Sequence, residues 1–269
     1  MKNPMTDQVF DADIARVAHL LADAARAVIL PFFRTSELDA DNKEANGFDP
    51  VTEADRAAER AMRALLETHR PQDAILGEEY GTKDGSSGLT WVLDPIDGTR
   101  GFISGTPTWG VLIAVSDANG PFYGIIDQPY IGERFEGAPT GATLTGPHGT
   151  KALVTRIPRD LADATVLTTF PEVGSDVART AFHAVAGQTR LTRYGMDCYG
   201  YALLAAGQVD LVIEAGLAPY DIQGPIAVVQ AAGGIVTDWQ GGPAHQGGRA
   251  LAAANAEIHA QALEILRAY

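Results

Sequence analysis

The amino-acid sequence predicts an α/β protein built from two unlike halves. Residues 1–151 place two amphipathic helices before a run of strands, a pattern typical of an α+β unit. Residues 152–269 alternate strands with helices, a pattern typical of an α/β unit. No flexible linker marks the change, so we expect two units that meet near residue 152.

Two helices open the first half. Apolar side chains within residues 6–33 recur every three or four positions, which predicts a helix that Pro31 ends. Thr52 stands where it can cap a second helix. The apolar positions of that helix keep helical spacing until shortly before Pro71.

The strands of the first half follow these helices. Two of them form a hairpin whose turn lies at residues 117–120, and a glycine-rich turn is expected at residues 101–105. The predicted strands cover residues 74–76, 91–93, 109–115 and 122–126, with short pieces within residues 131–149.

The second half contains four strands and four helices by the same criteria. Glycines 233 and 234 mark the end of its most apolar helix. The strands are predicted at residues 166–169, near Leu191, at 210–213 and at 235–238, and the helices at 177–185, 199–206, 221–232 and from Asn255 onward.

Composition narrows the class of protein. Of the 269 residues, 46% are hydrophobic and 20% are charged, and no apolar run approaches the length of a membrane span. The polar start lacks the apolar core of a signal peptide, so we expect a cytoplasmic protein that does not bind membranes. The net charge of −14 argues against nucleic acid as a partner. The single cysteine, Cys198, excludes an internal disulfide and cysteine-rich zinc sites.

One segment, residues 91–102, carries the clearest chemical signal. An apolar run ends in Asp94 and Asp97, which Pro95 separates, and the pair Gly98 and Thr99 follows. Carboxylate oxygens are the ligands that Mg²⁺ prefers, and backbone N–H groups in a tight turn can bind an anion. The alternative is a strand that ends in an ordinary polar turn, because these residue types are common in turns.

Further acidic residues stand at the ends of other predicted elements. Glu78 follows the strand at residues 74–76, so two strand ends carry acids. Asp55 lies in the first turn of the second helix, where the helix dipole alone would explain it. Asp221 begins the apolar helix at residues 221–232, and an ordinary N-cap is the alternative reading.

These motifs resemble, in order and spacing, the signatures of the inositol monophosphatase family of metal-dependent phosphatases. The similarity extends from Lys43 to Asp238 and departs from the family at Gln223, where a small residue is usual. The resemblance implies the family's layered αβαβα sandwich. The matching segments are residues 49–55, 77–79, 91–99, 220–221 and 233–234.

The resemblance also implies a site that binds two or three Mg²⁺ ions. Gly98 and Thr99 would receive the phosphate, and Glu78 with the Thr99 hydroxyl would orient the attacking water. Asp55 would hold a further ion or its waters, and Lys43, otherwise a solvated side chain, would lie beside the cluster. The implied metal ligands are Glu78, Asp94, the backbone carbonyl of Ile96, Asp97 and Asp221.

Within the family, several segments look most similar to the histidinol-phosphate phosphatases. These are Arg100 and residues 193–199, 210–214 and 217–221. Arg100, Asp197 and Glu214 would then contact the substrate. For Asp197 the alternative is a cap of the helix that begins near Tyr199.

The expected activity is therefore Mg²⁺-dependent hydrolysis of L-histidinol phosphate, a step of histidine biosynthesis, by a homodimer. An inositol phosphate or a 3′-phosphonucleotide is the alternative substrate. A non-catalytic protein that binds a phosphorylated metabolite is the alternative of another class, and its expected mark would be a missing metal ligand.

Overall fold

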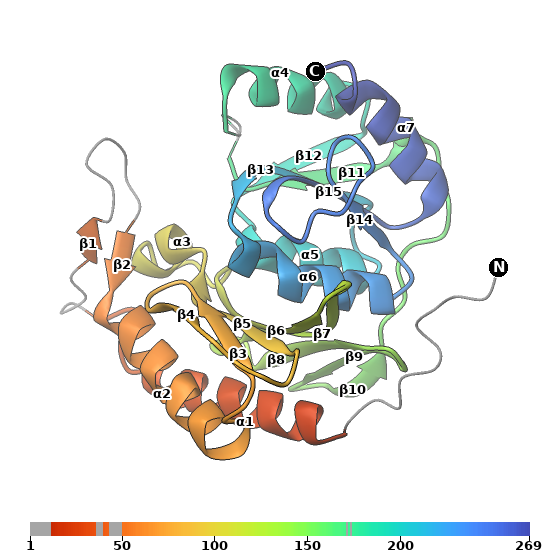
Figure 1. Cartoon of the computed structure of the whole chain (residues 1–269). Coiled ribbons are helices and arrows are strands. Elements are labelled where there is room, and N and C mark those ends of the chain that lie inside the picture. Colours follow the sequence, from red (N-terminus) through yellow and green to blue (C-terminus); the bar gives the residue numbers. More distant parts are fainter. Residues whose placement is uncertain (1–11, 36–39, 43–49, 171, 173) are drawn as a thin grey trace.

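The computed structural model describes residues 12–35, 40–42, 50–170, 172 and 174–269, and its elements stack in five layers. Helices and sheets alternate through the stack, as Figure 1 shows. Helices α1 (Ala12–Ile29) and α2 (Glu53–His69) form one outer layer, and α4 (Asp176–Ala186) and α7 (Ala256–Leu266) form the other. Helices α5 (Asp197–Ala205) and α6 (Pro219–Ala231) lie between the two sheets. The predicted αβαβα sandwich is confirmed.

An eight-stranded sheet makes up most of the first half. Its strand order is β10-β9-β8-β7-β6-β5-β3-β4, and only the β3 and β5 pair is parallel. A separate antiparallel pair joins β1 (Ala40–Asn42) to β2 (Pro50–Thr52). The strands of the large sheet are β3 (Ala74–Gly77), β4 (Gly81–Lys83), β5 (Thr90–Asp97), β6 (Gly110–Asp117), β7 (Gly120–Gln128), β8 (Glu133–Ala138), β9 (Gly141–Gly146) and β10 (Gly149–Ala152).

A five-stranded sheet makes up the second half, in the order β12-β11-β13-β15-β14. Strands β11, β12 and β13 are parallel, whereas β15 is antiparallel to both of its neighbours. A short 3₁₀ helix at Leu161–Asp163 precedes this sheet. The strands are β11 (Thr165–Thr168), β12 (Leu191–Tyr194), β13 (Leu211–Leu217), β14 (Ile235–Thr237) and β15 (Gly248–Ala253).

The predicted helices form where capping and apolar spacing place them. Thr52 caps α2, because its hydroxyl accepts a hydrogen bond from the Ala54 N–H. Asn255 caps α7 in the same way, through the N–H groups of Glu257 and Ile258. The first residues of the helix predicted over residues 6–33 lie outside the described part of the chain, and α1 is observed from Ala12 onward.

Four local predictions were wrong. Residues 101–105 are not only a turn, because helix α3 (Thr99–Ile103) occupies most of that segment. Helix α5 begins at Asp197 and α6 at Pro219, each two residues before the predicted start. Strand β15 was not predicted, because Gly248-Arg249-Ala250 gives it no β-branched or aromatic residues.

Two glycines let α6 approach the large sheet closely. A Cβ atom at Gly124 would lie 2.6 Å from the Gly224 carbonyl oxygen, and one at Gly137 would lie 2.5 Å from the Ala227 oxygen. Both contacts are shorter than a side chain tolerates, so only glycine fits there. Helix α6 is thereby fixed against β7 and β8, and its first turn lies beside the end of β5.

Three apolar clusters hold the layers together. The first packs α1 and α2 against one face of the large sheet, around Trp91, Trp109 and Phe102. The second surrounds α5 and α6 and joins the two sheets. The third packs α4 and α7 against the outer face of the small sheet. Because the second cluster draws on both sheets, the central layer belongs to both halves of the chain.

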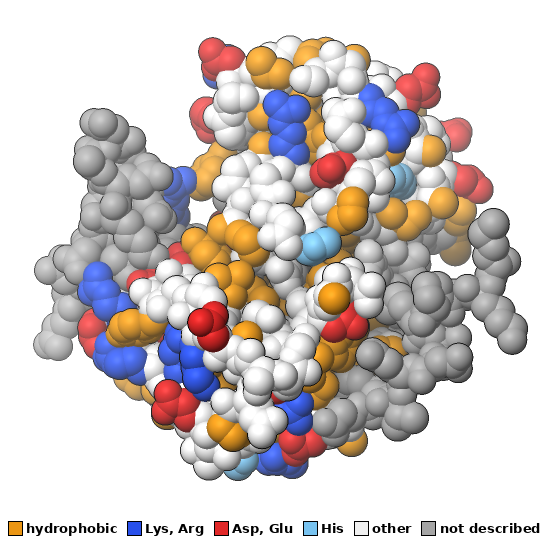
Figure 2. Space-filling view, viewed as in Figure 1, with side chains coloured by type: hydrophobic (Ala, Val, Ile, Leu, Met, Phe, Trp, Pro, Cys, Tyr) orange, Lys and Arg blue, Asp and Glu red, His pale blue; other side chains and the backbone are white. Residues whose placement is uncertain are grey.

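The surface mixes the two signs of charge. On the face shown in Figure 2, basic side chains are interspersed with acidic ones and do not gather into one patch. Within the described residues no helix is both long and apolar enough to cross a membrane.

Candidate active site

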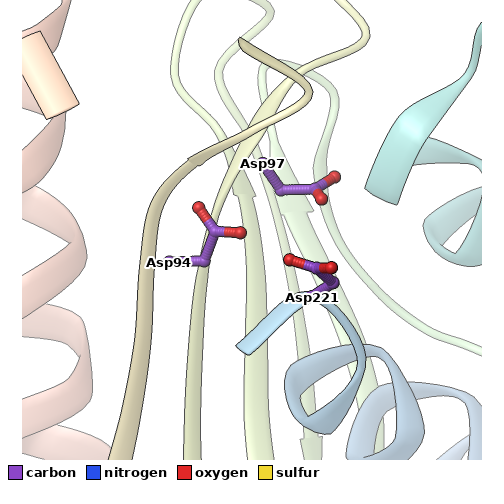
Figure 3. Close-up of side chains that lie close together, drawn as sticks. All are labelled: Asp94, Asp97 and Asp221. Carbon is purple, nitrogen blue, oxygen red and sulfur yellow. The ribbon is translucent and has the colours of Figure 1, made fainter. Parts of the chain in front are cut away.

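A cavity of about 250 Å³ opens where β5 ends and where helices α3, α5 and α6 begin. Three carboxylates stand together in it: oxygen atoms of Asp94, Asp97 and Asp221 all lie within 4.8 Å of one another. Figure 3 shows Asp94 and Asp97 on one strand and Asp221 at the start of a helix, grouped around a common space. Residues more than 120 positions apart in the sequence thus form one acidic cluster.

A bulge in β5 brings the two aspartates of that strand to the same side. In a regular strand, residues three apart point to opposite faces. Here Asp94 pairs with Leu112 and Asp97 with Gly110, so β5 has one more residue than β6 between the two pairings. The extra residue reverses the alternation. Pro95 lies within the bulge, where its missing N–H costs no ladder hydrogen bond.

Backbone donors hold the other two carboxylates of the cluster. The Cys198 N–H, in the first turn of α5, donates to Asp97 Oδ2 at 2.7 Å. The Ala218 N–H donates to Asp221 Oδ2 at 2.7 Å, which closes the N-terminus of α6. Asp221 is therefore the third residue of its helix rather than its N-cap, and its carboxylate lies with the cluster.

The cluster brings several carboxyl groups together in a buried part of the protein. Burial, followed by the charges of Glu78, Asp97 and Asp221, raises the pKa of Asp94 well above its usual value. Burial and the charge of Asp221 likewise raise the pKa of Asp97. Asp94 is only 2% exposed, and its Oδ1 has no hydrogen-bond partner. An orphaned carboxylate oxygen among other oxygen donors fits a hard divalent cation such as Mg²⁺.

Gly98 and Thr99 form the turn that leaves the cluster. Gly98 has φ of 83°, in the left-handed region that favours glycine. A Cβ atom there would lie 2.7 Å from Asp197 Cγ, so a side chain would also collide with the opposite wall. The Thr99 hydroxyl donates to the Ile96 carbonyl oxygen at 3.1 Å. Arg100 is exposed at the cavity rim, with its guanidinium carbon 4.7 Å from the centre of the Phe170 ring.

Asp197 faces the cavity from the first position of α5. Its φ of 45° is unusual for a residue other than glycine. Its Oδ2 accepts a hydrogen bond from the Thr108 hydroxyl at 3.1 Å, and no side-chain cap is present at the start of α5. The alternative reading of Asp197 as a helix cap is thus wrong. Burial raises the pKa of this carboxyl group.

Glu214 lies on β13 in the same cavity and is 7% exposed. Its Oε1 accepts from the Thr169 N–H at 2.6 Å and from the Thr169 hydroxyl at 2.9 Å, and its Oε2 accepts from the Thr168 hydroxyl at 3.1 Å. Burial raises the pKa of Glu214 to about 7, although these three donors act in the opposite direction.

Two predicted residues are not placed in the cavity. Asp55 is buried in the capping box of α2, where its Oδ2 accepts from the N–H and hydroxyl of Thr52. Its Oδ1 has no partner among the described residues, and burial raises its pKa to about 7, with smaller contributions from the charges of Glu78 and Glu79. Lys43 lies outside the described residues. Glu78 and Ile96 do line the cavity.

The structure adds cavity residues that the motifs did not identify. Thr169 and Phe170 follow β11, and Tyr201 comes from α5. Cys198 is buried and also lines the cavity. The strand-end position of Thr169 was a usable signal, because Glu78 and Gly98 also line the cavity directly after a strand. No sequence signal could have identified Tyr201 as a cavity residue, because it lies in an apolar helix.

Comparisons with known proteins agree with this arrangement. A family model described as the inositol monophosphatase family matches residues 11–269. The chain is 40% identical to a bifunctional phosphatase, IMPL2, of Arabidopsis thaliana over 99% of its own length and 79% of the relative's. It is 34% identical to a histidinol-phosphatase of Streptomyces coelicolor over 94% of its length and 97% of the relative's. The solved structure of an inositol monophosphatase from Zymomonas mobilis matches with a TM-score of 0.85 and 39% identity, over 97% of this chain and all of that one.

Proposed function

The chain belongs to the inositol monophosphatase family, and from that premise we propose that it hydrolyses L-histidinol phosphate to L-histidinol and phosphate with Mg²⁺. It is a phosphatase that acts on phosphoric monoesters, as the family and its curated relatives are. The family is metal-dependent, and the cluster of Asp94, Asp97 and Asp221 can hold a metal ion.

We assign the metal ligands to the residues that carry oxygen atoms into the cavity. The Ile96 carbonyl can serve even though it accepts from Thr99, because a carbonyl oxygen has two lone pairs. When bound, Mg²⁺ lowers the pKa of a water molecule and neutralises charge on the phosphoryl and leaving oxygens. The proposed ligands are Glu78, Asp94, the Ile96 carbonyl, Asp97 and Asp221, for two ions.

The remaining residues of the cavity position the reactants. Because the Thr99 hydroxyl donates to Ile96, its oxygen stays an acceptor, and with Glu78 it can orient the attacking water. The N–H groups of Gly98 and Thr99 receive the phosphate in the turn after β5. The unpartnered Oδ1 of Asp55 is the group that would hold a third ion or its waters, and Asp55 also fixes the start of α2.

The acidic residues that line the cavity favour a substrate with a positively charged organic group. Among the described residues the cavity lining contains six acidic residues, Glu78, Asp94, Asp97, Asp197, Glu214 and Asp221, and one basic residue, Arg100. Four of the acids are assigned to metal, so Asp197 and Glu214 remain for the organic part of the substrate. Histidinol phosphate carries an ammonium group and a titratable imidazole, which these two acids would stabilise. The names of several relatives point to the same substrate.

The alternatives are an inositol phosphate and a 3′-phosphonucleotide. Glu214 does not separate them from histidinol phosphate, because a carboxylate also accepts hydrogen bonds from hydroxyl groups. Asp197 does separate them, because a second acid that lines the cavity is of most use against a cation.

A panel of phosphate monoesters, assayed at one Mg²⁺ concentration and again in excess chelator, tests the proposal. We expect the highest kcat/KM for histidinol phosphate, lower values for inositol 1-phosphate and a 3′-phosphonucleotide, and no turnover in chelator. A preference for inositol phosphate would overturn the substrate, and turnover in chelator would overturn the metal mechanism.

A further inference from the structure

The Tyr201 hydroxyl is a buried polar group whose use is not explained by the fold. Tyr201 is 3% exposed, and its hydroxyl oxygen has no hydrogen-bond partner in the part of the chain that the structure describes. The residue nevertheless lines the candidate active-site cavity. Asp197, Cys198 and Tyr201 are spaced by one and three positions along α5, so that they share one face of the helix, and all three line the cavity.

Packing alone would favour phenylalanine at this position. Leaving a buried donor unpaired destabilises a protein, whereas a phenyl ring fills the same space without that cost. Burial, together with the charges of Glu214, Asp97 and Asp221, raises the pKa of Tyr201 well above its usual value. The group therefore stays a neutral phenol, which can both donate and accept a hydrogen bond.

Tyr201 shares the cavity with groups from two parts of the site, namely Asp97 and Asp221 of the proposed metal cluster and Glu214 of the wall that faces the organic group. The charges of the same three residues, that of Glu214 first, act on the Tyr201 hydroxyl. Among the described residues, Glu214 Oε2 accepts one hydrogen bond, from Thr168, so it can accept another.

We propose that the Tyr201 hydroxyl, with Glu214, binds the polar group on the carbon next to the phosphoester carbon of the substrate. The enzyme would then select phosphate monoesters that carry an ammonium or a hydroxyl group at this vicinal position. An ammonium group donates to both residues, and a hydroxyl group accepts from Tyr201 and donates to Glu214. The inference rests on the proposed function for the location of the phosphate at the aspartate cluster.

Three simple esters isolate the vicinal group, namely 2-aminoethyl phosphate, 2-hydroxyethyl phosphate and propyl phosphate. They differ only in the ammonium, hydroxyl or methyl group at that position. For the unchanged enzyme we expect kcat/KM to be about a hundredfold higher for the two polar esters than for propyl phosphate, because the polar group bonds to both Tyr201 and Glu214 and one ordinary hydrogen bond gives about a factor of ten. In Tyr201→Phe this ratio should fall about tenfold, because only the bond to Glu214 remains.

Tyr199→Phe is the matched control, because it removes a hydroxyl group from the same helix. Tyr199 does not line the cavity, and its hydroxyl donates to Glu133. We expect Tyr199→Phe to keep the substrate ratio and to lower the Tm by about 2–4 °C, as one lost hydrogen bond does in a chain of this size. Tyr201→Phe should not lower the Tm of the ligand-free protein, since its hydroxyl has no partner to lose.

The outcomes separate this inference from the proposed function. A substrate ratio that is unchanged in Tyr201→Phe, or a ratio near one in the unchanged enzyme, overturns the role of Tyr201. A Tm loss in Tyr201→Phe equal to that of Tyr199→Phe overturns it too, because the hydroxyl would then have a structural partner. If the unchanged enzyme does not hydrolyse histidinol phosphate but Tyr201→Phe lowers the ratio, the proposed substrate is wrong and the role of Tyr201 stands.

Discussion

The backbone N–H of Cys198 donates a hydrogen bond of 2.7 Å to Oδ2 of Asp97. This bond ties the first turn of α5, from the second half of the chain, to the end of β5 in the first half. Asp221 also comes from the second half, on α6. The acidic cluster is therefore complete only when both halves are packed together, so that metal affinity and docking of the halves depend on each other.

Replacing Asp94 by Asn should remove most of the activity and keep the fold. Asp94 Oδ1 is unpartnered, and the side chain faces other carboxylates, so the neutral amide relieves repulsion in the metal-free protein. We expect kcat/KM to fall by more than about a hundredfold, beyond the loss typical of residues that only support a metal ligand. The Tm in chelator should stay the same or rise. Full activity of this variant, with an unchanged Mg²⁺ requirement, would contradict the metal assignment.

Gly98→Ala should damage both stability and phosphate binding. The left-handed φ alone costs about 1–2 kcal/mol for a residue with a Cβ. At Gly98 the new atom would also lie 2.7 Å from Asp197 Cγ. Gly88→Ala is the matched control, because Gly88 has φ of 84° and no atom within 4 Å of the added Cβ. Denaturant unfolding gives the free energy of unfolding of both variants. The extra loss in Gly98→Ala measures the cost of the contact with Asp197.

Only Gly98→Ala should also raise the KM for a phosphate monoester, since Gly98 lines the cavity and Gly88 does not. Equal destabilisation of the two variants, with equal kinetics, would show that Gly98 serves the turn alone.

The stability of the metal-free protein should fall as pH rises from 5 to 8. Asp55 and Glu214 each have a pKa of about 7 in the folded protein, above the usual carboxyl value. Between these values the folded state holds protons that the unfolded chain has released, so stability is lost as pH rises through that window. A shift of this size corresponds to roughly 3 kcal/mol for one group.

Thermal unfolding in chelator at pH 5, 6, 7 and 8 measures this dependence. Carboxyl groups with lowered pKa values, such as Asp73 and Glu136, act in the opposite sense only below about pH 5 and do not affect the window. Glu214→Gln should flatten the profile. A Tm that rises from pH 5 to pH 8 would show that folding does not raise the pKa values of Glu214 and Asp55.

The sequence predicted the parts of this molecule that local patterns specify. Capping by Thr52, the closing helix near Asn255 and the apolar spacing of α1 and α2 follow from neighbouring residues, and the structure confirms them. The acids at the ends of β3 and β5 were found because they interrupt apolar runs. The homodimer, the cytoplasmic location and the division at residue 152 stay predictions.

The rest depends on contacts between distant segments. Asp197 forms part of the cavity wall because the start of α5 contacts Thr108 and Gly98. These residues lie about 90 and 100 positions away in the sequence. From the sequence, Tyr201 is a core residue of a helix rich in alanine and leucine. That it lines the cavity depends on how α5 is oriented about its axis in the folded protein. Strand β15 pairs with β13 and β14 through backbone hydrogen bonds, and its small side chains gave no sign of a strand in the sequence.

Asp197→Asn is the sharpest test of the cationic substrate. The variant should fold normally, because asparagine tolerates the φ of 45° and keeps an oxygen that can accept from Thr108. A hydrogen bond to a charged group contributes roughly 1.5–3 kcal/mol. We therefore expect kcat/KM for histidinol phosphate to fall by about ten- to a hundredfold, since about 1.4 kcal/mol is a factor of ten. For an uncharged aryl phosphate the loss should be much smaller, because no cation then faces Asp197. Equal losses on both substrates would mean that Asp197 supports the Gly98 turn rather than the organic group, and the preference for a cationic substrate would need another source.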